Sequence, residues 1–231
     1  MGANMAPKYA NIFTYDHEEQ IVLQNILFSH YIFWYCRYVD DIFFVWKGSR
    51  EKLLQSADYV NRTHNTITFV LHFDRTQIEF LDVQVRREKD KLSTNLYRKS
   101  VHKNSMLRFD SFHPPNTMSG LPKSQLMRCK RITSTNDNYL NSKEKMLDMF
   151  RKKGYPRPVL QKAEDEVDKL TRAVLLSIKK KEERCHRIPF VSTYVTHSKR
   201  VRKVVRKYWP ILMNDPTTSG LNESWGLNCF L

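Results

Sequence analysis

The first half of the chain alternates between strand-like and helix-like patterns of apolar residues. Two runs rich in aromatic and β-branched residues, 32–36 and 42–46, favour strands because such side chains suit a pleated surface. Between them lies the tetrapeptide Tyr38–Asp41, whose acidic pair predicts a tight turn. Strict alternation of apolar and polar residues from Ile67 to Phe73 predicts a half-buried strand.

Helices are predicted on either side of this hairpin. Asp16 and Glu19 have capping-box spacing, which predicts a helix over 17–29. Ser49 is placed to cap a second helix, because apolar residues recur at helical spacing after it. Further strands are predicted over 78–86 and 92–98. Helix, hairpin, helix and strands in this order are typical of an antiparallel α+β fold.

The pattern becomes mainly helical near residue 101. Pro122 suits the first turn of a helix that runs through Arg131. Apolar spacing predicts a second helix over 139–150, stopped by Gly154 and Pro156, and a third, long helix over 159–174. A short strand over 187–196 and a basic helix over 198–208 are predicted next. The residues from 214 onward carry no recognisable pattern.

Composition indicates an acidic partner. The 231 residues include 39 Lys and Arg against 24 Asp and Glu, a formal net charge of +15. This excess favours nucleic acid over a membrane surface, the alternative being a charge that only keeps the protein soluble. No apolar run approaches membrane-spanning length, so no membrane contact is predicted. The four cysteines are far apart without a CxxC pair, which indicates reduced thiols in an intracellular protein.

The acidic turn has its own chemistry. A hairpin holds Asp40 and Asp41 at its tip, where carboxylate oxygens can bind a hard divalent cation. Polymerases use such carboxylates to hold two metal ions, which activate a hydroxyl and stabilise the leaving oxygen. The alternative is a solvated turn without a ligand.

The order of several short sequence segments along the chain is informative. Residues 1–11 precede the Tyr38–Asp41 tetrapeptide, and Ile78–Val83 follows it. Further blocks lie at residues 111–117, 120–125 and 154–156. In this order they resemble the reverse transcriptase of Penelope-like retroelements, with residues 1–11 similar to the second half of motif B and Ile78–Val83 similar to the primer-grip strand. The resemblance covers roughly residues 1–212.

The resemblance implies a site for metal and primer. It makes Asp40 a ligand of catalytic Mg²⁺ or Mn²⁺, with Asp41 either a second ligand or a residue that orients the turn. An RNA template and a DNA primer are the implied partners. Contacts to them are implied for Tyr38, Val39, Gly2, Pro7, Asn11, Phe80 and Leu81.

Basic residues in the second half predict contacts to the nucleic-acid backbone. One set starts the helix after Pro122, where backbone N–H groups also favour phosphate. The other interleaves with valines, which gives one apolar and one cationic helix face, and a merely solvated cationic face is the alternative. The two sets are Lys123, Arg128, Lys130 and Arg131, and Lys199, Arg200, Lys203 and Arg206.

Together these patterns predict three regions. Residues 1–100 are expected to form a partial antiparallel reverse-transcriptase palm, residues 101–186 a helical thumb whose leading helices equally fit a helix-turn-helix, and residues 187–231 a basic linker and tail. The expected function is a fragment of an RNA-directed DNA polymerase in the nucleus, inactive alone because motif A and the fingers are absent. The alternative is a non-enzymatic nucleic-acid-binding helix-turn-helix module.

Overall fold

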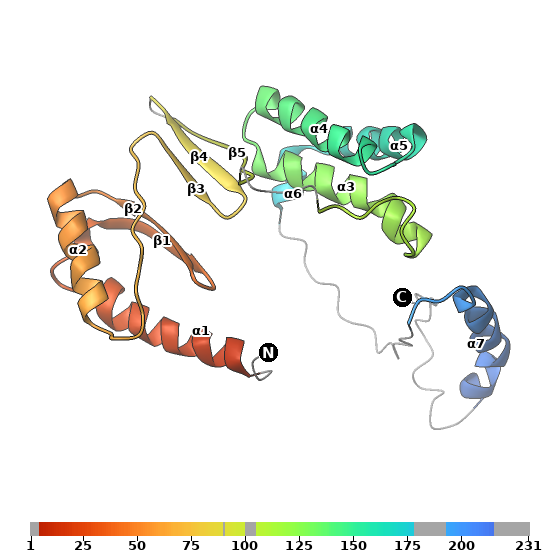
Figure 1. Ribbon diagram of the computed structural model, residues 1–231, viewed down its shortest axis with the longest axis horizontal. Helices are drawn as coiled ribbons and strands as arrows, with labels where there is room; N and C mark the ends of the chain where they lie inside the picture. Colours follow the sequence, from red (N-terminus) through yellow and green to blue (C-terminus); the bar gives the residue numbers. More distant parts are fainter. Residues whose placement is uncertain (1–4, 90, 100–104, 178–192, 215–231) are drawn as a thin grey trace. The chain divides into compact units, whose positions relative to one another are not determined.

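The computed structural model describes residues 5–89, 91–99, 105–177 and 193–214, and it divides into two compact units (Figure 1). The N-terminal unit is Met1–Arg98 and the C-terminal unit is Lys99–Leu231. Helices and antiparallel strands both occur, which confirms the predicted α+β class. Over the described ranges, no helix has the length and apolarity that crossing a bilayer requires.

The described part of the N-terminal unit holds two small antiparallel sheets and two α-helices. The hairpin β1–β2 forms one sheet, and β3, β4 and β5 form the other in chain order. Its elements are α1 (Ala6–His17), a π-helical turn (Glu18–Leu23), a 3₁₀ turn (Ser29–Tyr31), β1 (Ile32–Tyr38), β2 (Asp41–Trp46), α2 (Arg50–Arg62), β3 (Gln77–Phe80), β4 (Val83–Glu88) and β5 (Lys91–Leu96).

The predicted hairpin and the helix after it are confirmed. Tyr38 pairs with Asp41, so Val39 and Asp40 alone form the turn. Ser49 caps α2 because its side chain accepts a hydrogen bond from the backbone N–H of Lys52 at 3.3 Å. The third predicted strand of this half is also present as β5.

The start of the first helix was predicted wrongly. The helix begins at Ala6, with Pro7 in its first turn, where the missing proline N–H costs no hydrogen bond. Asp16 is therefore inside the helix, and its carboxylate accepts a hydrogen bond from the amide of Gln20 at 2.9 Å. The spacing of Asp16 and Glu19 is therefore not a capping box, and Asp16 instead pairs with Gln20 one turn further along the helix.

The single strand predicted over 78–86 is also wrong, because it is two strands. Phe80 pairs with Val83, and Leu81 between them adopts a φ of 54°. A left-handed residue cannot continue a strand, so the chain reverses there. The apolar run that predicted one long strand spans both arms of a hairpin and its turn.

The strand predicted from Ile67 to Phe73 has no strand partner among the residues that the structure describes. From Ile67 to His72 the side chains alternate between half-buried and exposed, as the sequence pattern requires, but Phe73 is exposed instead of half-buried. However, Phe69 makes its backbone hydrogen bonds with a side chain, Asn61, instead of with a strand. Period-two alternation indicates an extended chain on a packed surface, but a sheet also needs a neighbouring strand.

The C-terminal unit contains a helical bundle and one further helix. Its elements are α3 (Pro115–Ile132), α4 (Asn136–Arg151), α5 (Arg157–Asp168), α6 (Arg172–Leu176) and α7 (Ser198–Met213). Figure 1 shows α3, α4 and α5 packed side by side. Their shared core contains the largest fully buried apolar side chains of the described residues, among them Leu126, Met146, Leu147, Phe150 and Val167.

Two predicted boundaries of the bundle differ from the structure. Helix α3 begins at Pro115, so Pro122 is inside the helix, where its ring is fully buried. The stripe formed by Met118, Pro122 and Leu126 packs into the core, and this burial outweighs the hydrogen bond that Pro122 cannot make. The long third helix is divided into α5 and α6, because Thr171 caps a new helix by accepting from the N–H of Val174 at 3.3 Å.

The remaining predictions concern the end of the chain. The basic helix is present as α7, which extends past its predicted end at Tyr208 to Met213. Most of the strand predicted over 187–196 lies outside the described residues, and residues 193–195 are not in a strand.

Candidate nucleic-acid interface

The turn between α4 and α5 has a defined geometry. Gly154 adopts a φ of 82°, and its N–H donates to the carbonyl of Arg151 at 3.0 Å. The N–H of Tyr155 donates to the carbonyl of Phe150 at 3.2 Å. These two bonds around a left-handed glycine are a Schellman motif, which satisfies carbonyls that a helix end otherwise leaves free. Pro156 then directs the chain into α5.

Aromatic packing fixes this turn from the inside. The ring of Tyr155 is only 4% exposed and lies 4.9 Å from the ring of Phe150 and 5.1 Å from that of Phe109. The N–H of Phe109 donates to the carbonyl of Lys153 at 2.9 Å, which attaches the segment before α3 to the turn. Burial also raises the pKa of the Tyr155 hydroxyl. The hydrogen bonds and ring contacts therefore hold the turn in one conformation, and the rings of Tyr155 and Phe150 are buried in the core of the bundle.

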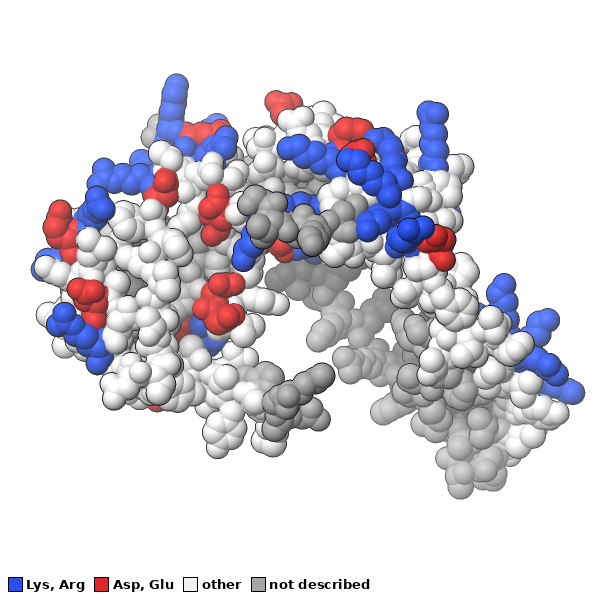
Figure 2. Space-filling model, in the orientation of Figure 1, with Lys and Arg blue, Asp and Glu red and all other residues white. Residues whose placement is uncertain are grey.

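Basic side chains surround the same turn. On the face drawn in Figure 2, Lys and Arg gather over the bundle. Arg151 and Lys152 form ion pairs of 2.7 Å with acidic residues of α4, but both basic side chains are more than half exposed. Solvent-exposed pairs contribute little stability, so an incoming phosphate can replace the carboxylate. For Lys153 and Arg157, no ion pair forms within the described ranges.

Two of the four predicted basic residues of α3, in contrast, donate hydrogen bonds to other helices of the fold. The ammonium of Lys130 donates to the carbonyls of Val167 and Asp168 at 3.1 and 3.3 Å, which caps the end of α5. Arg131 caps α6 through a 3.1 Å bond to the carbonyl of Leu175.

The other two predicted residues of α3 are more accessible. Lys123 pairs with Glu166 at 2.6 Å and remains 45% exposed, and Arg128 is exposed. The carbonyl of Arg131 itself, at the end of α3, accepts from Arg172 at 3.2 Å. The ion pair of Lys123 is partly exposed, so a phosphate can replace its carboxylate as at Arg151 and Lys152.

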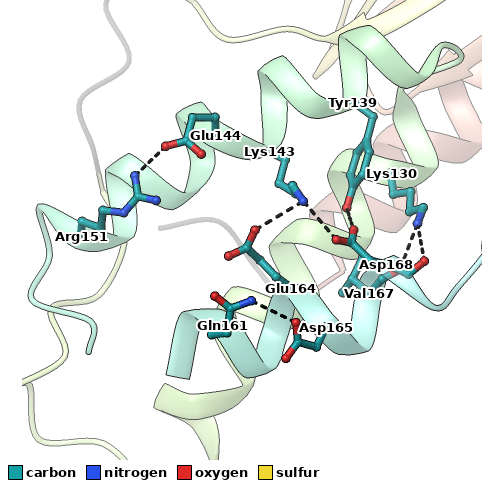
Figure 3. A network of polar contacts seen from close by, with 10 residues as sticks. All are labelled: Lys130, Tyr139, Lys143, Glu144, Arg151, Gln161, Glu164, Asp165, Val167 and Asp168. Carbon is teal, nitrogen blue, oxygen red and sulfur yellow. Dashed lines mark hydrogen bonds and ion pairs between the residues drawn. The ribbon is translucent and has the colours of Figure 1, made fainter. Parts of the chain in front are cut away.

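A polar network locks α4 against α5 (Figure 3). Asp168 accepts from the hydroxyl of Tyr139 at 3.0 Å and from the ammonium of Lys143 at 3.1 Å. Burial disfavours ionised Asp168, but the hydrogen bonds from Lys143 and Tyr139 outweigh it and hold the pKa of this carboxyl below its usual value. Burial likewise opposes the charge on Lys143, whose pKa is nevertheless raised by Asp168 and Glu164. The angle between α4 and α5 is thus fixed by charge as well as by packing.

Helix α7 carries the second predicted basic set. Six basic residues and no acidic residue occur between Ser198 and Met213. At helical spacing the cations share one face, and Figure 2 shows blue side chains along one side of this helix. The opposite face is apolar, with Val204 and Ile211 exposed by 49% and 66%. Lys199, Arg200, Lys203 and Arg206 all belong to the cationic face.

The acidic turn of the N-terminal unit is held by Arg37. Asp40 and Asp41 are exposed at the tip of the hairpin. The guanidinium of Arg37 donates to the carbonyl of Val39 at 2.8 Å and lies 2.7 Å from the buried carboxylate of Glu18. Val39 has a φ of 57°, which is strained for a β-branched residue.

The residues predicted to contact primer and template are only partly brought together. Asn11 accepts from Arg37 at 3.1 Å, which links α1 to the hairpin, and Phe80 packs on Phe43 of β2 at 5.5 Å. Tyr38 and Val39 are exposed at the hairpin, and Leu81 is in the β3–β4 turn. Pro7 lies in α1, whereas Gly2 lies outside the described residues.

Nothing in the described ranges groups three or more His, Cys, Asp or Glu side chains in a way that could hold a metal ion. Mg²⁺ or Mn²⁺ binding at Asp40 and Asp41 therefore remains a prediction.

The basic turn between α4 and α5 was not among the sequence predictions. Its signal is nonetheless present in the chain, since Arg151, Lys152, Lys153 and Arg157 flank a glycine that ends an amphipathic helix. Gly154 was recognised only as a helix stop. A helix-ending glycine with basic residues on both sides could have identified this turn as a candidate contact to phosphate.

Comparison with known protein families finds a similarity within the C-terminal unit. Residues 105–163 match a family model. The match is to an animal helix-turn-helix domain. It spans α3, α4, the basic turn and the first part of α5, a limited part of the 231 residues. No curated protein and no solved structure matches the chain.

Proposed function

We propose that the α3–α6 bundle binds double-stranded nucleic acid through the α4–α5 turn and the start of α5. The observation that carries this proposal is the basic, Schellman-capped turn within the helix-turn-helix match. In such motifs the second helix lies in the major groove with its N-terminal residues at the base edges, while the first helix crosses the backbone, so the turn between the two helices lies near phosphates. Here we take α4 and α5 as the two helices, with Lys152 and Lys153 in the turn and Arg157 at the start of α5.

A duplex fits this surface better than a single strand. Proteins that hold single strands stack the bases on exposed aromatic rings. Tyr155 and Phe150, the aromatic residues beside the turn, are both buried in the bundle. The surface offers charge without stacking platforms, and regularly spaced phosphates of a duplex match it.

The experiment is a binding titration of the whole chain on a fluorescent duplex across a range of salt concentrations. Replacing Lys152, Lys153 and Arg157 with Gln is expected to flatten the salt dependence by about 2 to 3 units, since each lost phosphate contact lowers the slope by about 0.9. A matched triple variant, with Arg87, Lys89 and Lys91 of the β4–β5 hairpin replaced by Gln, should keep the slope. Equal losses in both variants would mean that only net charge matters, and the proposed interface would be wrong.

We infer, as a second candidate, that the N-terminal unit is a segment of a reverse-transcriptase palm. It is supported by the acidic pair at the tip of a two-residue hairpin turn and by the strained Val39 that Arg37 holds. Strained backbone that the surrounding contacts enforce is a feature of functional sites. In this reading the hairpin belongs to a site for Mg²⁺ or Mn²⁺, an RNA template and a DNA primer.

Paramagnetic Mn²⁺ tests this candidate without needing turnover. Titrating Mn²⁺ into isotopically labelled chain should first broaden the amide signals of Val39–Ile42. The broadening should vanish when Asp40 and Asp41 are replaced by Asn.

In primer extension we expect no templated synthesis, because the palm also needs a motif A carboxylate. Broadening spread evenly over all acidic surfaces would contradict the metal site, and extension abolished by Asp40→Asn would contradict the expected inactivity.

A further inference from the structure

One extended segment of the N-terminal unit has the pattern of a strand but no neighbouring strand. Between Ile67 and His72, half-buried and exposed side chains alternate one by one. Figure 1 draws this part of the chain, between α2 and β3, as a long trace outside both sheets. Period-two burial is the signature of a strand lying on a packed surface.

A side chain occupies one edge of this segment. The amide of Asn61 accepts from the N–H of Phe69 at 2.6 Å and donates to the carbonyl of Phe69 at 3.0 Å. Exchange of both backbone bonds is what a hydrogen-bonded partner residue does in an antiparallel ladder. Asn61, fixed on α2, thus replaces a neighbouring strand at Phe69 and holds the segment in place.

The opposite edge is open. In an extended chain the backbone groups of successive residues point to opposite edges, so those of Thr68, Val70 and His72 point away from Asn61. Their N–H and C=O groups make no hydrogen bond within the described part of the chain. The side chain of Val70, in the middle, is 75% exposed. An edge with exposed apolar residues and free backbone groups is a template for strand pairing.

We propose that this edge pairs with the same edge of a second copy of the chain, antiparallel and centred on Val70. The free backbone N–H and C=O groups determine the register. They meet across the two copies when Val70 faces Val70 of the partner and Thr68 faces His72. All three residues occupy hydrogen-bonded positions of the ladder, which leaves Phe69 and its Asn61 contact undisturbed.

The sequence complements itself in this register. Ile67 faces Phe73, a pairing of β-branched and aromatic side chains that favours antiparallel strands. Thr68 faces His72, and no two like charges oppose each other within the extended residues 67–73. Few residues take part, so the interface is small and the expected association is weak and reversible. This dimer is independent of the proposed nucleic-acid interface.

Sedimentation of the whole chain tests the pairing. We expect a concentration-dependent dimer with a dissociation constant on the order of 10 to 500 µM, as for small transient interfaces. Val70→Pro removes the central N–H from both copies and should weaken the dimer about tenfold or more. Val70→Thr keeps the N–H and the β-branched shape and should stay within about threefold of the original. A chain that remains monomeric at millimolar concentration would overturn the proposal.

Register is tested by nuclear magnetic resonance on a mixture of labelled and unlabelled chains. The proposed pairing predicts an intermolecular Hα–Hα contact between Phe69 and Leu71, which face each other at a close, non-hydrogen-bonded position. A peptide copying residues 65–75 should compete for the edge, and the same peptide N-methylated at Val70 should not. If a shuffled alternating peptide competes equally well, the edge accepts strands in general and the proposed self-recognition is wrong.

Discussion

Phe150→Ala should lower the free energy of unfolding of the α3–α6 bundle by about 3 to 5 kcal/mol, the cost of removing a large aromatic side chain from a packed core. The Phe150 side chain is 1% exposed and contacts Tyr155, so the substitution leaves a cavity beneath the basic turn. Hydrogen exchange of the α4 amides at increasing urea, followed by mass spectrometry in the whole chain, measures the change.

Leu140→Ala is the matched control, because Leu140 lies on the same helix and is 46% exposed. It should change the same free energy by less than about 0.5 kcal/mol. If Phe150→Ala leaves no folded bundle to measure, Phe150→Leu should still show a loss of about 1 to 2 kcal/mol. A loss below about 1 kcal/mol for Phe150→Ala would mean that the core closes over the missing ring and that the turn does not rest on it.

Neutralising the cationic face of α7 should change the salt dependence of binding more than neutralising the α4–α5 turn, because four cations are removed instead of three. Replacing Lys199, Arg200, Lys203 and Arg206 with Gln removes four candidate phosphate contacts. The salt dependence of duplex binding should have a slope on the order of 3 to 6 in the original chain and flatten by about 3 in the variant, with affinity falling on the order of a hundred- to a thousand-fold at physiological salt. Salt-dependent fluorescence anisotropy on a duplex or an RNA–DNA hybrid measures both quantities.

Charge, and not side-chain identity, is the variable that this experiment isolates. Lys199→Arg with Lys203→Arg keeps the charge and should keep the slope. The quadruple variant should remain folded, since exposed charges contribute little to stability. An unchanged slope would assign this face to solvent and leave nucleic-acid binding to the α4–α5 turn.

Local sequence signals predicted the elements whose determinants are local. The hairpin follows from β-branched and aromatic runs around an acidic turn, and α2 follows from Ser49 at its N-cap. Helix α4 ends where Gly154 adopts a left-handed φ, as its glycine stop indicated. In each case the residue that decides the boundary is within one turn of it.

The errors arise where distant contacts decide. Pro122 sits inside α3 because its ring is buried in the core, which no local pattern reveals. The break before α6 reflects Thr171 together with Lys130, which caps α5 from another helix. At Leu81 a turn forms inside an apolar run that carries no glycine or proline.

The candidate site shows the same division between local and distant determinants. Sequence identified a basic second half, and α7 has the expected cationic face. It did not reveal that Lys130 and Arg131 serve as helix caps, because their acceptors lie 37 or more residues away. Charge can be counted along a chain, but whether a cation faces solvent or a carbonyl depends on packing.

The caps that join α3 and α6 are reciprocal, and this has a consequence for how the bundle opens. Arg131 of α3 donates to the carbonyl of Leu175 near the end of α6, and Arg172 of α6 donates to the carbonyl of Arg131 itself. If the end of α3 frays, α6 loses the hydrogen bond from Arg131, and if α6 frays, α3 loses the hydrogen bond from Arg172. The short helix α6, too brief to persist alone, is therefore tied to the fate of the longest helix of the bundle, and the two termini open and close as one cooperative step.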